Sequence, residues 1–320
     1  MVLPGGKENG RSLRYVPYEV LGTTPNVVVD GAAQEATVLT LSHWPGSGTH
    51  KALKADTSTE ICFRYLSAPE IAPEAEEARA VSVNHEDVDG LLGMWALLNP
   101  GVAWDHLEDL VAAATADDFG RITSERGAWL ALTFADLLRE GYAAALPRVA
   151  HVLGNLELYE GTYRAAWRRI EADRDALKTG RATLEEHPDI DLAVFRSHAP
   201  LHEWAQNSAT DRMRILEIVD GRIHGFRYRY ETWVQFVSRP LPPRVDLTPF
   251  LQTLNAIEEH PDAVWEFDGI GDLVPRLQLL DARGDAVASR IEPDRFLADL
   301  GEYLRLTQHD PDRIWNPYDP

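Results

Sequence analysis

The sequence contains a single cysteine, Cys62, among its 320 residues. A disulfide within the chain is therefore excluded, and so is a metal cluster held by several thiolates. Cys62 lies in a stretch with the apolar spacing of an amphipathic helix, where we expect a buried structural thiol. A metal or catalytic centre in this chain must be built from other side chains.

Positive charge and long apolar runs are also scarce. The 31 Lys and Arg residues are outnumbered by 51 Asp and Glu residues, which gives a formal net charge of −20. This balance argues against binding to long nucleic acids, which needs many cations against phosphates, but it is compatible with a local basic pocket for one small anion. No run approaches the roughly 18 apolar residues of a membrane span, and residues 1–11 have no apolar signal core. We therefore expect a cytoplasmic protein with no membrane partner.

The length and the order of local patterns predict two domains. A chain of 320 residues, 44% of them hydrophobic, can bury two cores. Residues 1–180 are predicted to form an α/β domain with a parallel sheet, and residues 181–320 an α+β domain that binds substrate or acts as a lid. In the first domain we expect strands at 26–30, 37–41 and 81–83, a solvated connection at 68–78, and helices starting at Thr57 and covering 91–98, 105–114, 125–139 and 143–177. In the second we expect strands at 191–195, 213–219 and 222–237 and near 264 and 277, a hairpin turn at Asp220-Gly221, and helices at 249–259 and 293–306.

The most informative segment is residues 81–90, with the sequence VSVNHEDVDG. An apolar run typical of a buried strand ends abruptly in His85, Asp87 and Asp89, and Gly90 allows a tight turn into the next helix. In an open α/β sheet, such a strand delivers its last side chains to the crevice at its carboxyl end. This segment therefore predicts metal ligands at a sheet edge.

Two other predicted strands and one helix end in the same kind of residue. The strand at 26–30 ends in Asp30, and the strand at 37–41 is followed by His43. The helix at 105–114 runs into an acidic break with Asp117 and Asp118, and the sequence does not choose between these two.

Together these residues supply two imidazoles and four carboxylates. Such an oxygen-rich set suits Mn²⁺ or Mg²⁺ better than a structural zinc, and two ions could share a bridging carboxylate. The predicted ligands are Asp30, His43, His85, Asp87, Asp89 and one of Asp117 and Asp118. The alternative is structural: Asp30 and Asp89 as turn acids, His43 as a satisfied, half-buried imidazole, and the acidic pair as a helix cap.

Residues 26–120 resemble the DHH phosphoesterase superfamily, which includes family II inorganic pyrophosphatases, oligoribonucleases and cyclic-dinucleotide phosphodiesterases. Residues 84–90 are similar to its first motif, 27–30 to its second, 41–44 followed by 55–61 to its third, and 115–120 to its fourth. The motifs stand in a permuted order. Ser42 and Trp44 occupy places where the family has Asp and a second His, and its Gly-Gly-Gly-His signature is missing from the sequence.

The resemblance implies hydrolysis of a phosphate ester or anhydride at a centre of two metal ions, with His43, His85 and Asp89 as catalytic groups. Three arginines of the second half, Arg227, Arg229 and Arg239, are predicted to clamp a small phosphorylated or sulfated substrate, because a guanidinium fork matches such anions. Arg227 and Arg229 alternate with aromatic residues as in a strand. The alternative for the arginines is a solvated sheet face.

Two other functions stay open at this point. The altered third motif favours a version in which phosphate or sulfate is expelled without water as the nucleophile. The other open function is a degenerate module that binds a nucleotide or a partner protein and catalyses no reaction. An oligomer or a partner subunit is compatible with each function.

Overall fold

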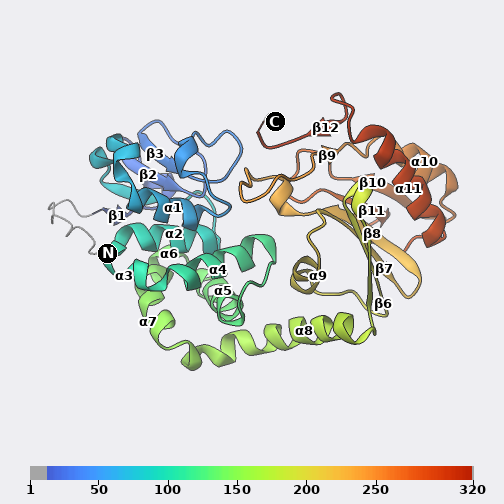
Figure 1. Ribbon diagram of the computed structural model, residues 1–320, viewed down its shortest axis with the longest axis horizontal. Helices are drawn as coiled ribbons and strands as arrows, with labels where there is room; N and C mark the ends of the chain where they lie inside the picture. Colours follow the sequence, from blue (N-terminus) through green and yellow to red (C-terminus); the bar gives the residue numbers. More distant parts are fainter. Residues whose placement is uncertain (1–12, 319–320) are drawn as a thin grey trace.

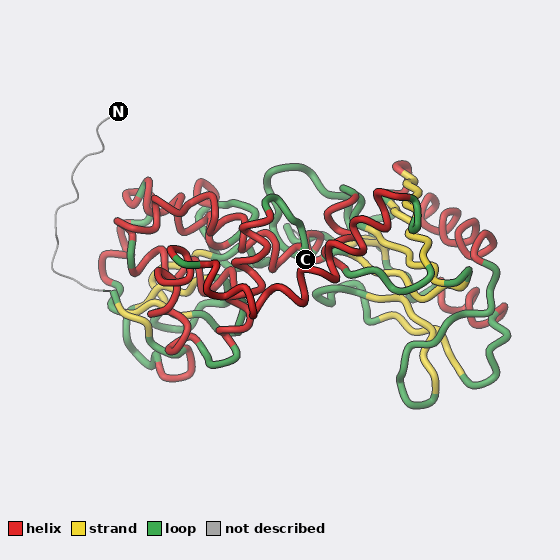
Figure 2. Tube along the Cα trace, turned by 90° about the horizontal axis from the view of Figure 1, so that it is seen from below, coloured by secondary structure: helices red, strands yellow, loops and turns green. Residues whose placement is uncertain are grey.

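The computed structural model describes residues 13–318, which form two lobes of mixed α/β structure (Figures 1 and 2). The predicted fold class is confirmed. The first lobe contains a sheet of four parallel strands in the order β1-β4-β2-β3. Its strands are β1 (Arg14–Tyr15), β2 (Asn26–Val29), β3 (Thr37–Leu41) and β4 (Ala80–Ser82). All of β2 and β4 is buried, which explains their runs of apolar and β-branched residues.

Helices pack around this sheet and build the first core. They are α1 (Ser58–Ser67), α2 (Val88–Leu98), α3 (Pro100–Ala103), α4 (Leu107–Phe119), α5 (Glu125–Leu138), α6 (Tyr142–Ala145) and α7 (Val149–Gly154). Helix α2 is almost entirely apolar after Asp89, which fits its position in the core, where all its residues except Leu98 are buried. Helix α1 begins at the predicted cap, where the Thr57 side chain accepts a hydrogen bond from the amide of Glu60.

Helix α8 (Glu160–Thr179) leads from the first lobe to the second (Figure 1). The second sheet has the order β10-β11-β8-β7-β6-β5, in which only β6 and β7 are parallel. Its strands are β5 (Thr183–His187), β6 (Leu192–Ser197), β7 (Arg214–Val219), β8 (Arg222–Tyr228), β10 (Ala263–Phe267) and β11 (Arg276–Asp281). Helices α10 (Phe250–Ile257) and α11 (Pro293–Thr307) share its main core, whereas α9 (Glu203–Ala209) lies toward the first lobe. The short strands β9 (Arg244–Val245) and β12 (Ile314–Trp315) pair separately.

Several expected boundaries are wrong. The predicted helix at 143–177 is broken into α6, α7 and α8, and α4 continues through the expected acidic break to Phe119. The strand expected at 222–237 ends at Tyr228 and is followed by a 3-10 turn at Tyr230–Thr232. The connection at 68–78 forms 3-10 turns, and three of its alanines are buried, so it is not wholly solvated. The Asp220-Gly221 hairpin is confirmed, with φ values of 48° and 72°.

A segment of the second lobe, residues 229–238, returns to the first lobe. The amide of Gln235 donates to the carbonyl of His43 at 2.8 Å. The amides of Val237 and Ser238 donate to the Asp56 carboxylate at 2.8 and 2.9 Å. The lobes are therefore joined by hydrogen bonds at the carboxyl edge of the first sheet. Within residues 13–318, no helix has the length and apolar character needed to cross a membrane.

Candidate metal centre

Asp30 follows directly after β2 and lies at the middle of a group of polar side chains. Because β2 is flanked by β3 and β4, residues at the carboxyl ends of all three strands meet around Asp30. Its backbone adopts a left-handed φ of 45°, which few residues other than glycine adopt. The next residue is Gly31, and a Cβ there would lie 2.2 Å from the side-chain oxygen of Asn84, so the Asn84 side chain would have to move. The backbone at Asp30 is therefore locally strained, and this conformation places its carboxylate at the sheet edge.

The two predicted histidines approach Asp30 from its two neighbouring strands. His43 Nε2 lies 3.2 Å from Asp30 Oδ1, and His85 Nε2 lies 3.3 Å from Asp30 Oδ2. The Nδ1 atom of His43 is 2.6 Å from the carbonyl oxygen of Asp56, and that of His85 is 3.2 Å from Asn84 Oδ1. Because these oxygens accept hydrogen bonds, each Nδ1 carries a proton, and Nε2, which faces Asp30, is the nitrogen that would offer a lone pair when the ring is neutral.

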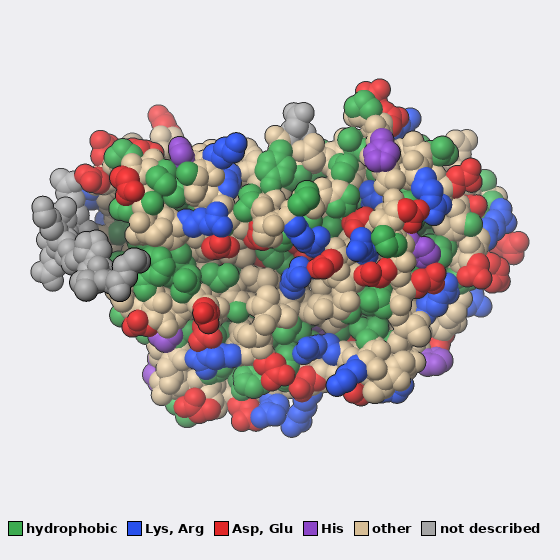
Figure 3. Space-filling model, in the orientation of Figure 1, with side chains coloured by type: hydrophobic (Ala, Val, Ile, Leu, Met, Phe, Trp, Pro, Cys, Tyr) green, Lys and Arg blue, Asp and Glu red, His purple; other side chains and the backbone are tan. Residues whose placement is uncertain are grey.

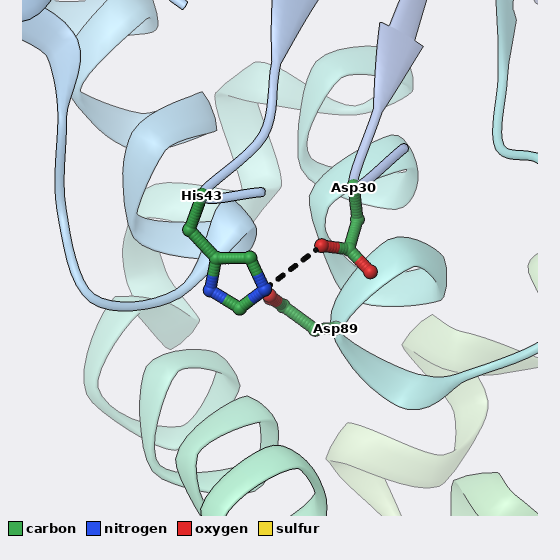
Figure 4. A group of neighbouring side chains, drawn as sticks. All are labelled: Asp30, His43 and Asp89. Carbon is green, nitrogen blue, oxygen red and sulfur yellow. Dashed lines mark ion pairs between the residues drawn. The ribbon is translucent and has the colours of Figure 1, made fainter. Parts of the chain in front are cut away.

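Two carboxylates come from the start of α2. The amides of Ser58 and Thr59, at the start of α1, donate to the two oxygens of Asp89 at 2.6 Å each. Asp87 caps α2 through its Oδ1, which accepts from Gly90 at 2.8 Å, while its Oδ2 lies 3.1 Å from His85 Nε2. Figure 4 shows His43 and Asp30 at the ends of neighbouring strands, with Asp89 approaching from the start of a helix.

The structure separates the two acids of the last turn of α4. Asp117 Oδ2 accepts a hydrogen bond from the amide of Val88 at 3.2 Å and so helps to cap α2. Asp118 Oδ2 lies 3.7 Å from His43 Nε2 and is buried without a hydrogen-bond partner. Asp118 is therefore the ligand candidate of the pair, and Asp117 has a capping role.

Potential ligand atoms fall into two groups that share Asp30. Asp30, His43 and Asp89 place one ligand atom each within 4.8 Å of one another, and so do Asp30, His85 and Asp87. Buried atoms without a hydrogen-bond partner include Asp30 Oδ2, His43 Nε2 and Asp118 Oδ2. Buried polar atoms are rarely left unpaired, and carboxylate and imidazole are suitable donors for Mn²⁺ or Mg²⁺. The donor set therefore fits metal ions at this position.

Negative charge exceeds positive charge in this cluster. Burial and the charge of Asp30 raise the pKa of Asp87 well above its usual value, and burial and Asp89 do the same to Asp118. Burial works against the charged form of Asp30, but its contacts with His43 and His85 hold its pKa well below the usual range. Burial likewise opposes the charged form of His85, yet its contacts with Asp30 and Asp87 raise its pKa to about 10. Without a bound cation, the cluster must retain protons to limit repulsion.

Aromatic side chains border the cluster. The centroid of the Trp44 ring lies 5.0 Å from that of the His85 ring and 5.4 Å from that of the Trp233 ring. The Tyr230 ring lies 6.0 Å from the His43 ring. Burial, together with the charges of the nearby aspartates, raises the pKa of Tyr230 well above its usual value, so its hydroxyl keeps its proton. The second lobe thus places Tyr230 beside the candidate ligand His43, and Trp233 beside Trp44.

The three predicted anion-binding arginines do not come together at the cluster. Arg229 is fully buried, pairs with Glu231 and donates to the carbonyl of Thr210, so the expected free clamp is wrong for this residue. Arg227 donates to Gln206 and Asn207 at 2.9 and 2.8 Å. Arg239 lies near Asp211, partly exposed. The alternative expectation, that Arg229 lies on a solvated sheet face, is wrong as well, because Arg229 is buried.

Sequence reasoning missed the groups that hold the ligands. The Tyr142 hydroxyl donates to the carbonyl of His85 at 2.7 Å and accepts from the amide of Asp87 at 3.0 Å, which fixes the loop between β4 and α2. The carbonyl of Asp56 orients His43. No local pattern marks either group, because each acts on a residue distant in the chain. The capping signal at Thr57 did mark the helix start that binds Asp89.

The fold and the site define a two-lobed α/β protein with a carboxylate–histidine cluster at the carboxyl edge of a parallel sheet. The chain belongs to a family of unknown function, DUF6687, whose model matches residues 11–140 and 133–314. No curated protein and no solved structure matches the chain.

Proposed function

We propose that this chain is a metal-dependent hydrolase that cleaves a phosphate ester or anhydride of a small anionic substrate. The observation that carries the proposal is the position of Asp30 between two imidazoles, each with its Nε2 atom facing a different oxygen of the same carboxylate and its Nδ1 atom held by an oxygen acceptor. A purely structural turn acid needs no such pair of oriented rings. A carboxylate in this position is suited to bridge two divalent ions.

The two groups of ligands differ in their access to solvent. The side chains of Asp30 and His43 are 1% and 0% exposed. Those of His85 and Asp87 are 35% and 17% exposed. A substrate would therefore reach the group formed by Asp30, His85 and Asp87, while the group formed by Asp30, His43 and Asp89 is enclosed. We propose the accessible group as the position of the reacting phosphoryl oxygens.

Two Mn²⁺ or Mg²⁺ ions would supply an activated water and neutralise phosphoryl charge. The residues of the chain have the remaining roles. Asp30 would be shared by the two positions, His43, Asp89 and Asp118 would hold the ion in the enclosed one, and His85 and Asp87 would hold the ion in the accessible one. The Asp56 carbonyl and Asn84 fix the ring orientations, as groups behind metal ligands commonly do. The protonated hydroxyl of Tyr230 is a hydrogen-bond donor beside the centre.

The first test is the metal content of untagged protein purified without chelator. We expect one or two Mn²⁺, Mg²⁺ or iron ions per chain, and loss of the metal in Asp30→Asn, which keeps the size of the side chain but removes the bridging charge. Asp175→Asn is the matched control, because Asp175 is exposed on α8 and pairs only with Arg181 among the described residues. A protein that stays free of metal after Mn²⁺ is added would contradict the proposal and favour the non-catalytic binding module.

The second test is turnover of phosphorylated and sulfated small molecules by the metal-loaded protein. We expect hydrolysis that is abolished in Asp30→Asn and retained in Asp175→Asn. In water labelled with ¹⁸O, the label should appear in the products. Product without label would contradict hydrolysis and favour direct displacement, whereas metal binding without turnover of either class of ester would contradict the proposed substrate class.

A further inference from the structure

A cavity lies at the junction of the lobes and is lined by residues of both, including Asp56, whose carbonyl contacts His43 Nδ1. It has a volume of about 590 Å³, within the range of small-molecule sites. The loop between β3 and α1 contributes Lys51, Lys54 and Asp56, and α1 contributes Arg64. The second lobe contributes several residues, among them Gln235. Figure 3 shows Lys and Arg side chains on the face of the first lobe near its boundary with the second.

The charges that line this cavity are unequal. Its three cations face only two carboxylates, Asp56 and Glu60. Glu60 pairs with Arg64 at 2.9 Å, and Asp56 accepts two amides from the second lobe. Neither lysine has an ion pair within residues 13–318. In a chain with a net charge of −20, a cavity with an excess of positive charge is a specific local feature.

Lys54 is the central cation of the cavity. Its ammonium group donates to three neutral oxygens: the Ser42 carbonyl at 3.4 Å, Ser47 Oγ at 3.2 Å and Gln235 Oε1. Partial burial lowers the pKa of Lys54 to about 8, which reflects the cost of holding this charge without a counter-ion. An anion in the cavity would supply that counter-ion.

The cavity is also connected to the candidate metal centre. Asp56 lines it with its side chain, while its carbonyl oxygen accepts from His43 Nδ1. Gln235 contacts Lys54 with its side chain, while its backbone amide donates to the His43 carbonyl. A ligand that contacts Lys54 and Gln235 would therefore influence the position of His43 through the backbone of Gln235.

We propose that this cavity binds a small multivalent oxyanion, either an organic phosphate or a polycarboxylate, at a site separate from the metal centre. The ammonium group of Lys54 pairs with the anion, the exposed Lys51 adds a second charge, and the anion joins the loop before α1 to the segment around Gln235. The proposal does not depend on the proposed function, since the cavity is lined by none of the candidate metal ligands.

Isothermal titration calorimetry of the full chain, both as purified and after treatment with EDTA and desalting, tests the proposal, and the comparison of the two samples separates binding in this cavity from binding to metal. Pyrophosphate and citrate are the probes, and the stronger of the two identifies the class of anion. We expect a single site that weakens with salt, with at least a tenfold higher Kd in Lys54→Met and a nearly normal Kd in Lys54→Arg. Lys178→Met is the control, because Lys178 is exposed on α8.

Lys51→Met provides a second variant whose folding is not in question, since Lys51 is an exposed side chain. A severalfold rise in its Kd is expected. Equal affinities in the native chain, Lys54→Met and Lys51→Met would overturn the proposal, and so would the absence of binding to the native chain at millimolar concentrations of both probes. Metal content, measured separately, reports only on the metal centre, so failure of one proposal is distinguishable from failure of the other.

Discussion

Asp117 and Asp118 are adjacent in the last turn of α4 and point to different partners. Asp118 should bind metal, so Asp118→Asn should weaken Mn²⁺ binding by at least tenfold, a loss comparable to that of other metal-site contacts. Asp117→Asn should leave Mn²⁺ affinity within about twofold and cost about 1 kcal/mol of stability, because a weaker acceptor then faces the Val88 amide. Titration with Mn²⁺ and thermal unfolding of both variants give the comparison. The reverse order of affinities would show that the assignment is wrong.

At the scale of single residues, the sequence predicted which residues lie at the sheet edge better than it predicted where their side chains point. Residues that follow a strand share the sheet edge, so Asp30, His43 and His85 could be placed together from their positions alone. The choice between Asp117 and Asp118 depends on a helix rotation of about 100° per residue and on α4 extending to Phe119. Arg229 could not be recognised as buried, because its partner Glu231 lies in a 3-10 turn that local alternation did not predict.

At the scale of elements, the end of α4 is held by the second lobe. Gly120 caps α4 with a φ of 58°, and a Cβ there would lie 3.0 Å from both Asn207 Nδ2 and Trp204 Cδ1. Gly180 caps α8 with a φ of 77° and has nothing within 4 Å of such a Cβ. Gly180→Ala should cost about 1 kcal/mol for the left-handed backbone alone, whereas Gly120→Ala should cost about 1–2 kcal/mol more because it overpacks α9.

Differential scanning calorimetry of these two variants measures the comparison, and Mn²⁺ titration adds a second readout. Because Asp118 lies two residues before Gly120, only Gly120→Ala should also weaken metal binding. Equal losses of stability in the two variants would mean that α9 does not constrain the end of α4. The elements themselves were largely predictable from alternation and caps, but this contact between α4 and α9 was not, since it joins residues 88 positions apart.

At the scale of the whole molecule, a metal ion bound in the first lobe should also order the second. The Gln235 amide donates to the His43 carbonyl, and Val237 and Ser238 donate to Asp56, which also orients His43. Fixing His43 therefore strengthens the contacts that hold residues 233–238 in place. This coupling cannot be deduced from the sequence, because the segment was expected to continue a strand of the second sheet.

Hydrogen exchange with and without Mn²⁺ tests this coupling. At a free Mn²⁺ concentration of about 100 times Kd, binding at one site adds about 2.7 kcal/mol to stability. Slower exchange should appear in peptides covering 40–44 and 83–90, and also in 233–238, although no proposed ligand lies in that segment. Peptides from β10 and β11, at the far edge of the second sheet, should be unchanged. Protection confined to the first lobe would mean that residues 233–238 are not coupled to metal binding. Protection that includes 233–238 would mean that metal binding and the contacts between the lobes are thermodynamically coupled.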